Sequence, residues 1–377
     1  MKVALVHDFL NQYGGAERVL EAIHELYPYS TIYTSLYDPT KLPLRLRNWD
    51  IKAFRLPRFP LAKSYTFFYP ILFENLDLSQ YDLVISSSSN FAKGVITKPT
   101  TPHIAYIHTP PRFLYHYPTE VNRRKIWFLK PFLAPLDNLL RIWDYAAAQR
   151  PDFLVTNSRE TAKRIKKFYG REATVIYPPI SLKPVASSQE QETNDSQLMT
   201  NDYFLVVSRL VEYKRIDLAI EVANRLALPL KIVGVGREEG RLKKLAGPTV
   251  EFLGLVSDER LSELYRNCQA FIFPGMEDFG ITPVEAMSFG KPVIALGEGG
   301  VLETVVSSQG RSASGREGKT GTFFAQETVE SLVEALESFD PKDYKPKDCI
   351  AQAKKFSKER FQKEFRNFVD AKLKGRK

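Results

Sequence analysis

The stretch 271–305 constrains the fold more than any other part of this sequence. Its first four residues, FIFP, predict a buried strand that ends at a proline. A polar turn with Glu277 and Gly280 follows, and Thr282 and Glu285 in TPVE predict a capping box that starts a helix. A strand, a loop and a helix in this order direct backbone N–H groups and the positive end of a helix dipole at one point. Such a corner is suited to bind a nucleotide diphosphate.

Two carboxylates, Glu277 and Glu285, flank this corner eight positions apart. Each also has an ordinary explanation, a solvated loop acid for Glu277 and a capping residue for Glu285. The setting favours a binding site, because Gly280 lets backbone approach a ligand. A second glycine turn, at 299–300, follows the next apolar strand.

The order of strand, turn and helix recurs along the chain. KVALVH at 2–7 precedes Gly14-Gly15 and a helical pattern at 16–27, and YFLVVS at 203–208 precedes a second such unit. This order predicts doubly wound parallel sheets. The glycine pair does not form a G-x-G-x-x-G fingerprint, so a dinucleotide site is not supported.

The chain of 377 residues is long enough for two domains. The segment 181–202 is polar and poor in aromatic residues, which predicts a mobile linker between domains at 1–180 and 203–356. The segment 349–377 reads as strongly helical, with apolar residues at helical spacing: Ala353, Phe356, Phe361, Phe365 and Phe368.

The cysteine content and the apolar segments of the chain indicate the cellular compartment of the protein. The two cysteines, Cys268 and Cys349, lie far apart, which predicts neither a disulfide nor a zinc site. The first residues resemble a strand rather than a signal peptide, and charges and prolines interrupt the apolar stretch 126–143. We therefore expect a cytoplasmic protein.

The net charge of +9 is unevenly distributed. Residues 1–180 contain 24 Lys and Arg against 15 Asp and Glu, whereas the remainder has 29 of each. Basic and aromatic residues alternate at 51–75 and again at 123–130. This pattern fits an anionic membrane surface or a lipid phosphate. Single-stranded nucleic acid and an ordinary solvated face would give the same pattern. We expect peripheral contact with the inner face of the cytoplasmic membrane and no nucleic acid partner.

The segment EDFGITPVEAMSFGKPVIA, from Glu277 onward, resembles the E-x7-E signature of the retaining, nucleotide-sugar-dependent glycosyltransferases of family four. The resemblance is nearest to the mannosyltransferase-like branch of O-antigen and exopolysaccharide assembly. Nearly the whole chain takes part, through HDFL at 7–10, GGAER at 14–18, YIHTPPR at 106–112, SR at 158–159, VSRL at 207–210, KR at 214–215 and FLG at 252–254.

The resemblance implies the GT-B architecture, in which two Rossmann-like domains face each other across a cleft. It also implies that the last helix, at about 357–377, packs back on the first domain. The implied reaction moves a hexose, with mannose from GDP-mannose as the first choice, from a nucleotide diphosphate-sugar to a saccharide or lipid-linked saccharide in cell-surface polysaccharide synthesis. It proceeds with retention and needs neither a metal ion nor a cofactor.

The resemblance also assigns roles to residues of this sequence. The catalytic group comprises Glu277, His108, Arg209 and Lys214. The donor-binding group comprises Gly14, Gly15, Arg209, Lys214, Gly236, Phe279, Gly280, Ile281 and Glu285. Arg112 and His116 follow His108 on the same loop, and from that position we expect them to bind a phosphate of the acceptor.

Two other classes of function fit parts of the same sequence. A nucleotide-sugar epimerase shares the architecture and would turn over the donor without an acceptor. A non-enzymatic polyanion-binding protein would use the basic aromatic first half, and its binding would depend steeply on salt. The ordered set of phosphate-binding turns favours the transferase.

Overall fold

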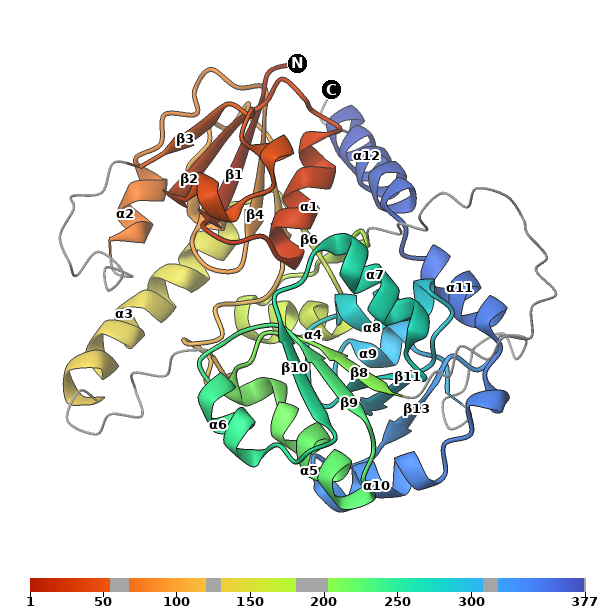
Figure 1. Ribbon diagram of the computed structural model, residues 1–377. Coiled ribbons are helices and arrows are strands. Elements are labelled where there is room, and N and C mark those ends of the chain that lie inside the picture. The colour runs from red at the N-terminus through yellow and green to blue at the C-terminus, as the bar shows by residue number, and fades with distance from the viewer. Residues whose placement is uncertain (55–67, 120–129, 181–202, 308–317, 376–377) are drawn as a thin grey trace. The chain divides into compact units, whose positions relative to one another are not determined.

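The computed structural model describes residues 1–54, 68–119, 130–180, 203–307 and 318–375. The chain divides into two compact units (Figure 1). Unit 1 is Met1–Pro179 with Lys358–Lys377, and unit 2 is Ile180–Ser357. The predicted linker at 181–202 lies outside the described residues, as do most of the basic aromatic segments, at 55–67 and 120–129.

Unit 1 is built on a seven-stranded parallel sheet with the order β3-β2-β1-β4-β5-β6-β7. The strands are β1 Val3–Leu10, β2 Thr31–Tyr37, β3 Ile51–Ala53, β4 Leu83–Ser88, β5 His103–Ile107, β6 Phe153–Thr156 and β7 Thr174–Val175. The helices are α1 Gly15–His24, α2 Tyr69–Glu74, α3 Lys130–Gln149, α4 Arg159–Tyr169 and α12 Lys358–Lys374, with short 3₁₀ turns at Pro39–Lys41, Leu44–Leu46 and Ala92–Gly94.

Unit 2 repeats this plan with a six-stranded parallel sheet in the order β10-β9-β8-β11-β12-β13. The strands are β8 Phe204–Val207, β9 Leu230–Val233, β10 Val250–Gly254, β11 Ala270–Phe273, β12 Val293–Leu296 and β13 Gly321–Phe324. The helices are α5 Ile216–Leu226, α6 Glu239–Leu245, α7 Asp258–Asn267, α8 Ile281–Ser288, α9 Val301–Thr304, α10 Val329–Glu337 and α11 Pro346–Lys354, with 3₁₀ turns at Glu212–Lys214 and Pro341–Asp343. The prediction of two doubly wound parallel α/β sheets is confirmed.

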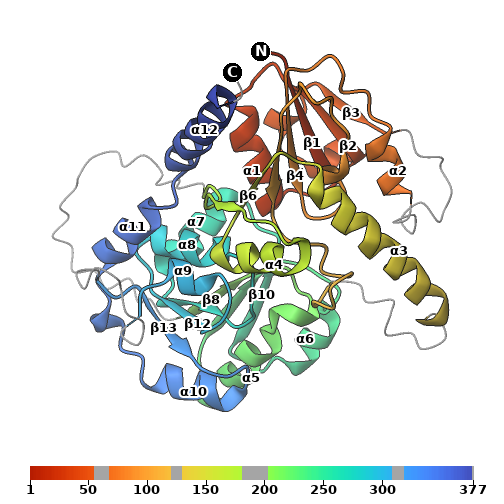
Figure 2. The same ribbon diagram turned by 180° about the vertical axis from the view of Figure 1, so that it is seen from behind.

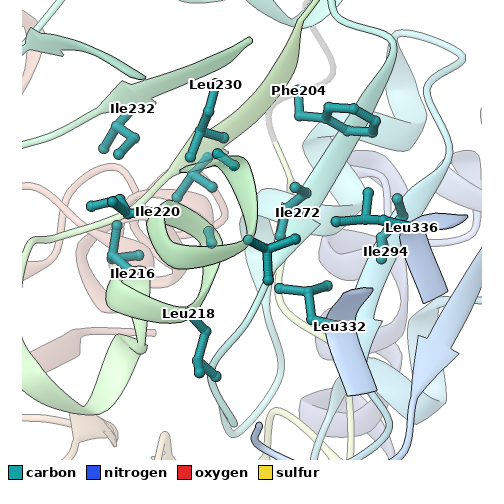
Figure 3. Packing of buried hydrophobic residues seen from close by; sticks show 14 of the residues in the cluster. Phe204, Ile216, Leu218, Ile220, Leu230, Ile232, Ile272, Ile294, Leu332 and Leu336 are labelled. Carbon is teal, nitrogen blue, oxygen red and sulfur yellow. The ribbon is translucent and has the colours of Figure 1, made fainter. Parts of the chain in front are cut away.

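The core of unit 2 shows why these segments form these elements. Helix α5 carries apolar residues at helical spacing, and Ile216 and Ile220 lie buried on the face it turns to the sheet (Figure 3). The strands are short apolar runs because both faces of a parallel sheet are covered. Burying each large side chain of this kind contributes roughly 1.5–3 kcal/mol.

The predicted helical segment at 349–377 consists of two helices, α11 and α12, with a break at residues 355–357. Phe356 packs on Phe279 inside unit 2, with ring centroids 5.6 Å apart. Phe361 packs on Tyr106 inside unit 1, with centroids 6.0 Å apart. The apolar residues whose spacing suggested a single helix face therefore belong to two separate cores. No helix in the described part of the chain is long and apolar enough to cross a bilayer.

Helix α12 lies beside α1 within unit 1, as both ribbon views show (Figures 1 and 2). The Lys358 ammonium contacts the Glu25 carboxylate at 2.5 Å, and the Gln362 amide donates to the Ala22 carbonyl at 3.1 Å. Phe361, Phe365 and Val369 are fully buried in the core of unit 1. The end of the chain is thus an integral part of unit 1.

Candidate active site

Each sheet has one place where its strand order reverses. In unit 1 the reversal lies between β1 and β4, and in unit 2 it lies between β8 and β11. Ligands of open α/β sheets bind at the carboxyl ends of the strands at such a switch point. The predicted site residues fall on loops and helix starts that follow strands of these two sheets.

In unit 2 the switch point brings Lys214 and Glu277 into contact. Lys214 ends the 3₁₀ turn that follows β8, and Glu277 lies on the loop that follows β11. Their ammonium and carboxylate form an ion pair, with side chains 9% and 25% exposed. Because β8 and β11 are neighbours, residues distant in sequence meet at one edge of the sheet.

Arg209 belongs to the same edge but differs from Lys214 in exposure. It follows β8, it is exposed, and its Nη2 donates to the Tyr213 hydroxyl at 3.0 Å. The Lys214 ammonium lies 5.1 Å from the centroid of the Tyr213 ring. Tyr213 therefore contacts both cations, one of them buried and one open to solvent.

The loop that carries Glu277 is held by the second glycine pair. The Gly300 N–H donates to the Glu277 carbonyl at 2.9 Å, and Gly299 forms a β-bridge with Glu277. The Gly299-Gly300 turn thus has a structural task, to support the Glu277 loop.

The predicted capping box at the start of α8 is wrong. The N-cap is Gly280, with a φ of +83° that favours glycine, so the helix already begins at Ile281. Thr282 and Pro283 lie in the first turn, where the missing N–H of a proline is tolerated. Glu285 is buried, and its Oε2 accepts a hydrogen bond from the Tyr265 hydroxyl at 3.2 Å.

Two further predicted donor residues, Phe279 and Gly236, have clear structural roles. The Phe279 ring is buried and packs on Phe356, so only its backbone can serve a ligand. Gly236 follows β9, and a Cβ there would lie 2.1 Å from the Leu210 carbonyl oxygen. Gly236 therefore packs closely against the loop that carries Arg209. Unit 2 brings all of its predicted site residues to one sheet edge.

In unit 1 the glycine pair forms the start of α1. Gly14 is the N-cap, and its N–H donates to the Glu17 carboxylate at 2.7 Å. Gly15 is the first helical residue, one position earlier than the predicted helix start. The pair lies after β1, at the switch point of the first sheet.

His108 follows β5 and is buried. Its Nε2 lies 2.8 Å from the Ser87 Oγ, and its ring packs on Tyr106 with centroids 5.1 Å apart. Arg112 and His116 share the next loop, where Arg112 is half-buried and His116 is exposed. His116 has a φ of +62°, which is uncommon for a residue other than glycine. The two histidines therefore differ in exposure, since His116 is open to solvent and His108 is buried.

Sequence reasoning did not predict the structural role of the Asp8 carboxylate near the end of β1. It accepts four backbone N–H groups at 2.5–2.8 Å, from Ser89, Asn90, Phe91 and Ala92. Successive N–H groups of this kind form an anion-binding nest. Asp8 fills the nest, so this loop does not offer it to a phosphate. The serine-rich turn after β4 was the available signal.

Comparison with known proteins agrees with this architecture. Residues 13–183 match the family described as Glycosyltransferase Family 4, and residues 188–356 match Glycosyl transferases group 1. Among solved structures, Anabaena Alr3699/HepE in complex with UDP and glucose has a TM-score of 0.67 at 17% identity, covering 98% of this chain and 99% of that one. Sucrose-phosphate synthase from Thermosynechococcus elongatus has a TM-score of 0.72 at 16% identity over the full length of both chains.

Two curated proteins illustrate the sequence similarity. Alpha-1,3/1,6-mannosyltransferase ALG2 of Candida glabrata is 27% identical over 371 residues, which cover 82% of this chain and 79% of that protein. O-antigen chain mannosyltransferase C of Escherichia coli is 25% identical over 193 residues, 48% of each chain. The fold and the two family matches define a GT-B glycosyltransferase. The chain belongs to the glycosyltransferases that join a Family 4 domain to a group 1 domain, as the sequence resemblance predicted.

Proposed function

We propose that this glycosyltransferase transfers mannose from a nucleotide diphosphate donor, GDP-mannose in the first instance, to a saccharide or lipid-linked saccharide acceptor in cell-surface polysaccharide synthesis. The names of two relatives, ALG2 and O-antigen chain mannosyltransferase C, support the choice of sugar. The observation that carries the donor site is the Lys214–Glu277 ion pair at the switch point of unit 2.

The chemistry follows from where charge develops. When the bond between the sugar carbon and the diphosphate breaks, negative charge grows on the leaving oxygen. Lys214 and Arg209 stabilise that charge, and the start of α8 adds its dipole. The leaving phosphate accepts the proton of the acceptor hydroxyl. The acceptor oxygen attacks the anomeric carbon of the sugar on the same face from which the phosphate departs, so the configuration is retained. The two fixed cations make a metal ion unnecessary.

The remaining residues bind the parts of the substrates. Glu277, with the backbone of Phe279 to Ile281, binds hydroxyls of the transferred sugar, and Glu285 binds the ribose. The ion pair with Glu277 holds the Lys214 ammonium in place before the donor arrives. His108 contacts the transferred sugar, the turn at Gly14 and Gly15 approaches the donor, and Arg112 and His116 contact a phosphate of the acceptor.

A thermal-shift screen against GDP, UDP and ADP with their sugars tests the donor, because a ligand of the folded state raises the melting temperature. We expect the largest shift with GDP and GDP-mannose. A shift with UDP-sugars alone would overturn the choice of donor. NMR of the product tests retention through the anomeric configuration. Loss of transfer in EDTA, restored by magnesium or manganese, would overturn metal independence.

Matched substitutions test the ion pair. Lys214→Met and Glu277→Gln should each lower kcat by roughly 10²–10³-fold, the effect of removing one preorganised group. Lys231→Met and Glu251→Gln are the controls, since this second pair, 3.6 Å apart, joins β9 to β10 within the same sheet. Equal losses in both pairs would show that the effect is on folding rather than on catalysis.

We also propose that unit 1 rests on the anionic inner face of the cytoplasmic membrane. Large apolar side chains are exposed on α3 at Leu139, Ile142 and Tyr145, and beside and on α2 at Phe68 and Ile71. The two helices are linked, because the Trp143 indole donates to the Glu74 carboxylate at 2.7 Å. The positive charge of residues 1–180 favours an anionic surface.

Vesicle co-sedimentation tests this contact. Vesicles rich in phosphatidylglycerol should retain the protein, and phosphatidylcholine vesicles should not. Ile142→Glu should weaken retention, whereas Tyr29→Glu, at a fully exposed position before β2, should not. Equal retention by both kinds of vesicle, or equal effects of both substitutions, would contradict the proposal.

A further inference from the structure

A chain of four buried polar side chains crosses the interior of unit 1. Glu17 lies in the first turn of α1, His7 on β1, Ser87 on β4, and His108 directly after β5. Their exposed fractions are 2%, 2%, 1% and 8%. The sheet register aligns them, since His7 pairs with Ser87 across the two strands and the His108 N–H donates to the Ser88 carbonyl.

The contacts are continuous from the helix start to His108. The Glu17 Oε1 lies 3.7 Å from the His7 Nε2, the His7 Nδ1 lies 3.1 Å from the Ser87 Oγ, and that oxygen lies 2.8 Å from the His108 Nε2. The other oxygen of Glu17 accepts the Gly14 N–H at 2.7 Å. Glu17 thus links the glycine turn to the two histidines.

The serine hydroxyl couples the protonation of the two rings. It has one proton, so it donates to one histidine nitrogen and accepts from the other. A neutral imidazole likewise has one N–H and one acceptor nitrogen. The tautomer of His108 therefore depends on that of His7.

Glu17 decides between the two arrangements. In a neutral His7 ring, a carboxylate beside Nε2 favours a proton on that nitrogen, which leaves the His7 Nδ1 as an acceptor. Ser87 must then donate to the His7 Nδ1 and accept from His108. His108 consequently carries its proton on Nε2, and its Nδ1 can only accept. The reverse arrangement would place a bare nitrogen against the carboxylate.

We propose that Glu17, His7 and Ser87 are positioning residues that fix His108 as the Nε2–H tautomer, so that its Nδ1 acts as a hydrogen-bond acceptor toward a hydroxyl of the transferred sugar. The assignment of His108 to the sugar rests on the proposed function. The tautomer itself rests only on the contacts within unit 1.

NMR of the full chain tests the tautomer without substitution. The sequence contains only five histidines, at positions 7, 24, 103, 108 and 116, so selective ¹⁵N-histidine labelling gives an assignable spectrum. At neutral pH we expect the His108 Nε2 in the protonated range and its Nδ1 in the unprotonated range. The opposite pattern for His108 would overturn the proposal, whether or not transfer activity has been found.

Kinetics of matched variants test the consequence. Ser87→Ala removes both links of the relay and should lower kcat about tenfold, comparable to loss of the outer partner of a ligating histidine, with KM for the donor nearly unchanged. Ser86→Ala is the control, because the equally buried Ser86 Oγ bonds a different histidine, the His103 Nε2, also at 2.8 Å. Ser87→Thr restores a hydroxyl and should recover most of kcat.

Glu17→Gln retains an oxygen for the Gly14 N–H but removes the charge that orients His7. We expect the His108 spectrum of this variant to show both tautomers. Equal loss of kcat in Ser87→Ala and Ser86→Ala, once corrected for the folded fraction, would show a purely structural role and overturn the proposal. An unchanged His108 spectrum in Glu17→Gln would overturn the part played by Glu17.

Discussion

The two units have the same strand order around the point where that order reverses, but they differ in the charged groups that lie there. In unit 1 the Asp8 carboxylate occupies the backbone N–H groups of the loop after β4. In unit 2 the corresponding edge carries Arg209 and Lys214 beside the start of α8. All of the excess positive charge of the chain nevertheless lies in residues 1–180. The net charge of a unit therefore does not coincide with the proposed diphosphate site, and the proposal rests instead on the local arrangement of charges and N–H groups in unit 2.

The largest effect expected from this comparison is that of Arg209→Ala. Without the guanidinium, the charge that develops on the leaving diphosphate loses a stabilising partner. We expect kcat to fall by about two to four orders of magnitude, as for other preorganised charge stabilisers. Steady-state transfer assays would measure this. Arg225→Ala, which removes an exposed arginine 3.8 Å from Glu330, should stay near wild type. A near-normal rate for Arg209→Ala would mean that the unit 2 edge is not the donor site.

Much of this edge could be predicted because its signals are local. The strand β11, the turn at Glu277 and Gly280 and the following helix occupy consecutive residues, so the periodicity of FIFP and the glycine are visible in one window. The helix start itself was predicted wrongly. A capping box is recognised from side chains alone, and the TPVE pattern placed the N-cap at Thr282. The left-handed backbone of Gly280 starts the helix two residues earlier.

Contacts between distant strands could not be predicted in this way. Asp8 and the loop at 89–92 are about eighty residues apart, and only the pairing of β1 with β4 brings them together. The contact of Ser87 with His7 depends on the same pairing, and its contact with His108 depends on the pairing of β4 with β5. The aromatic spacing of 356–365 also misled, because a periodic pattern does not say which core each residue enters. Sequence indicated the candidate residues, but only the sheet register indicated their partners.

Asp8→Ala gives the largest expected effect on stability. The substitution leaves four N–H groups without their acceptor, and two of them, those of Phe91 and Ala92, belong to buried residues of unit 1. We expect the free energy of unfolding to fall by about 3 kcal/mol or more, since each unsatisfied buried group costs roughly 1–3 kcal/mol. Urea denaturation followed by circular dichroism would measure the change. Asp82→Asn is the control, because Asp82 is exposed and should change stability by less than about 1 kcal/mol.

Adding inorganic phosphate to the Asp8→Ala variant tests whether the loop at 89–92 binds anions. If the loop at 89–92 is an anion nest, inorganic phosphate should partly restore the melting temperature of Asp8→Ala and leave that of the wild type unchanged. Equal stabilisation of both proteins by phosphate would contradict the view that Asp8 occupies this site.

Mild acid should distinguish the two units, because all five histidines belong to unit 1. Burial lowers the pKa of His103 to about 3. Between this value and the unfolded pKa of about 6.5, the unfolded chain binds a proton that the folded chain does not. Stability therefore decreases as the pH falls below about 6.5, by about 1.4 kcal/mol per pH unit from this residue. Burial also lowers the pKa of His24 and acts in the same direction.

Hydrogen exchange resolved by peptide would measure this difference. On going from about pH 7 to about pH 5, and after correction for intrinsic exchange, we expect unit 1 to lose more protection than unit 2. His103→Gln should reduce the loss, whereas His116→Gln, at an exposed position, should not. Equal loss of protection in both units would show that carboxylates rather than histidines dominate the response to acid.

The smallest predicted effect concerns the ribose. The Tyr265 hydroxyl donates to the buried Glu285, while its ring stacks on Phe289 with centroids 5.5 Å apart. Tyr265→Phe keeps the stacking and removes one donor from the carboxylate. We expect GDP to bind about fivefold more weakly, equivalent to about 1 kcal/mol, and pyrophosphate to bind as before.

Calorimetric titration of both ligands separates the two parts of the site. Tyr203→Phe is the matched control, because the Tyr203 hydroxyl donates to the Leu264 carbonyl at 2.9 Å and is equally a buried bond of unit 2. If Tyr265→Phe weakened GDP and pyrophosphate to the same extent, Glu285 would act on the diphosphate region rather than on the ribose. If neither ligand were affected, the nucleotide would not reach α8, and the carboxyl edge of unit 2 would bind the diphosphate through Arg209 and Lys214 alone.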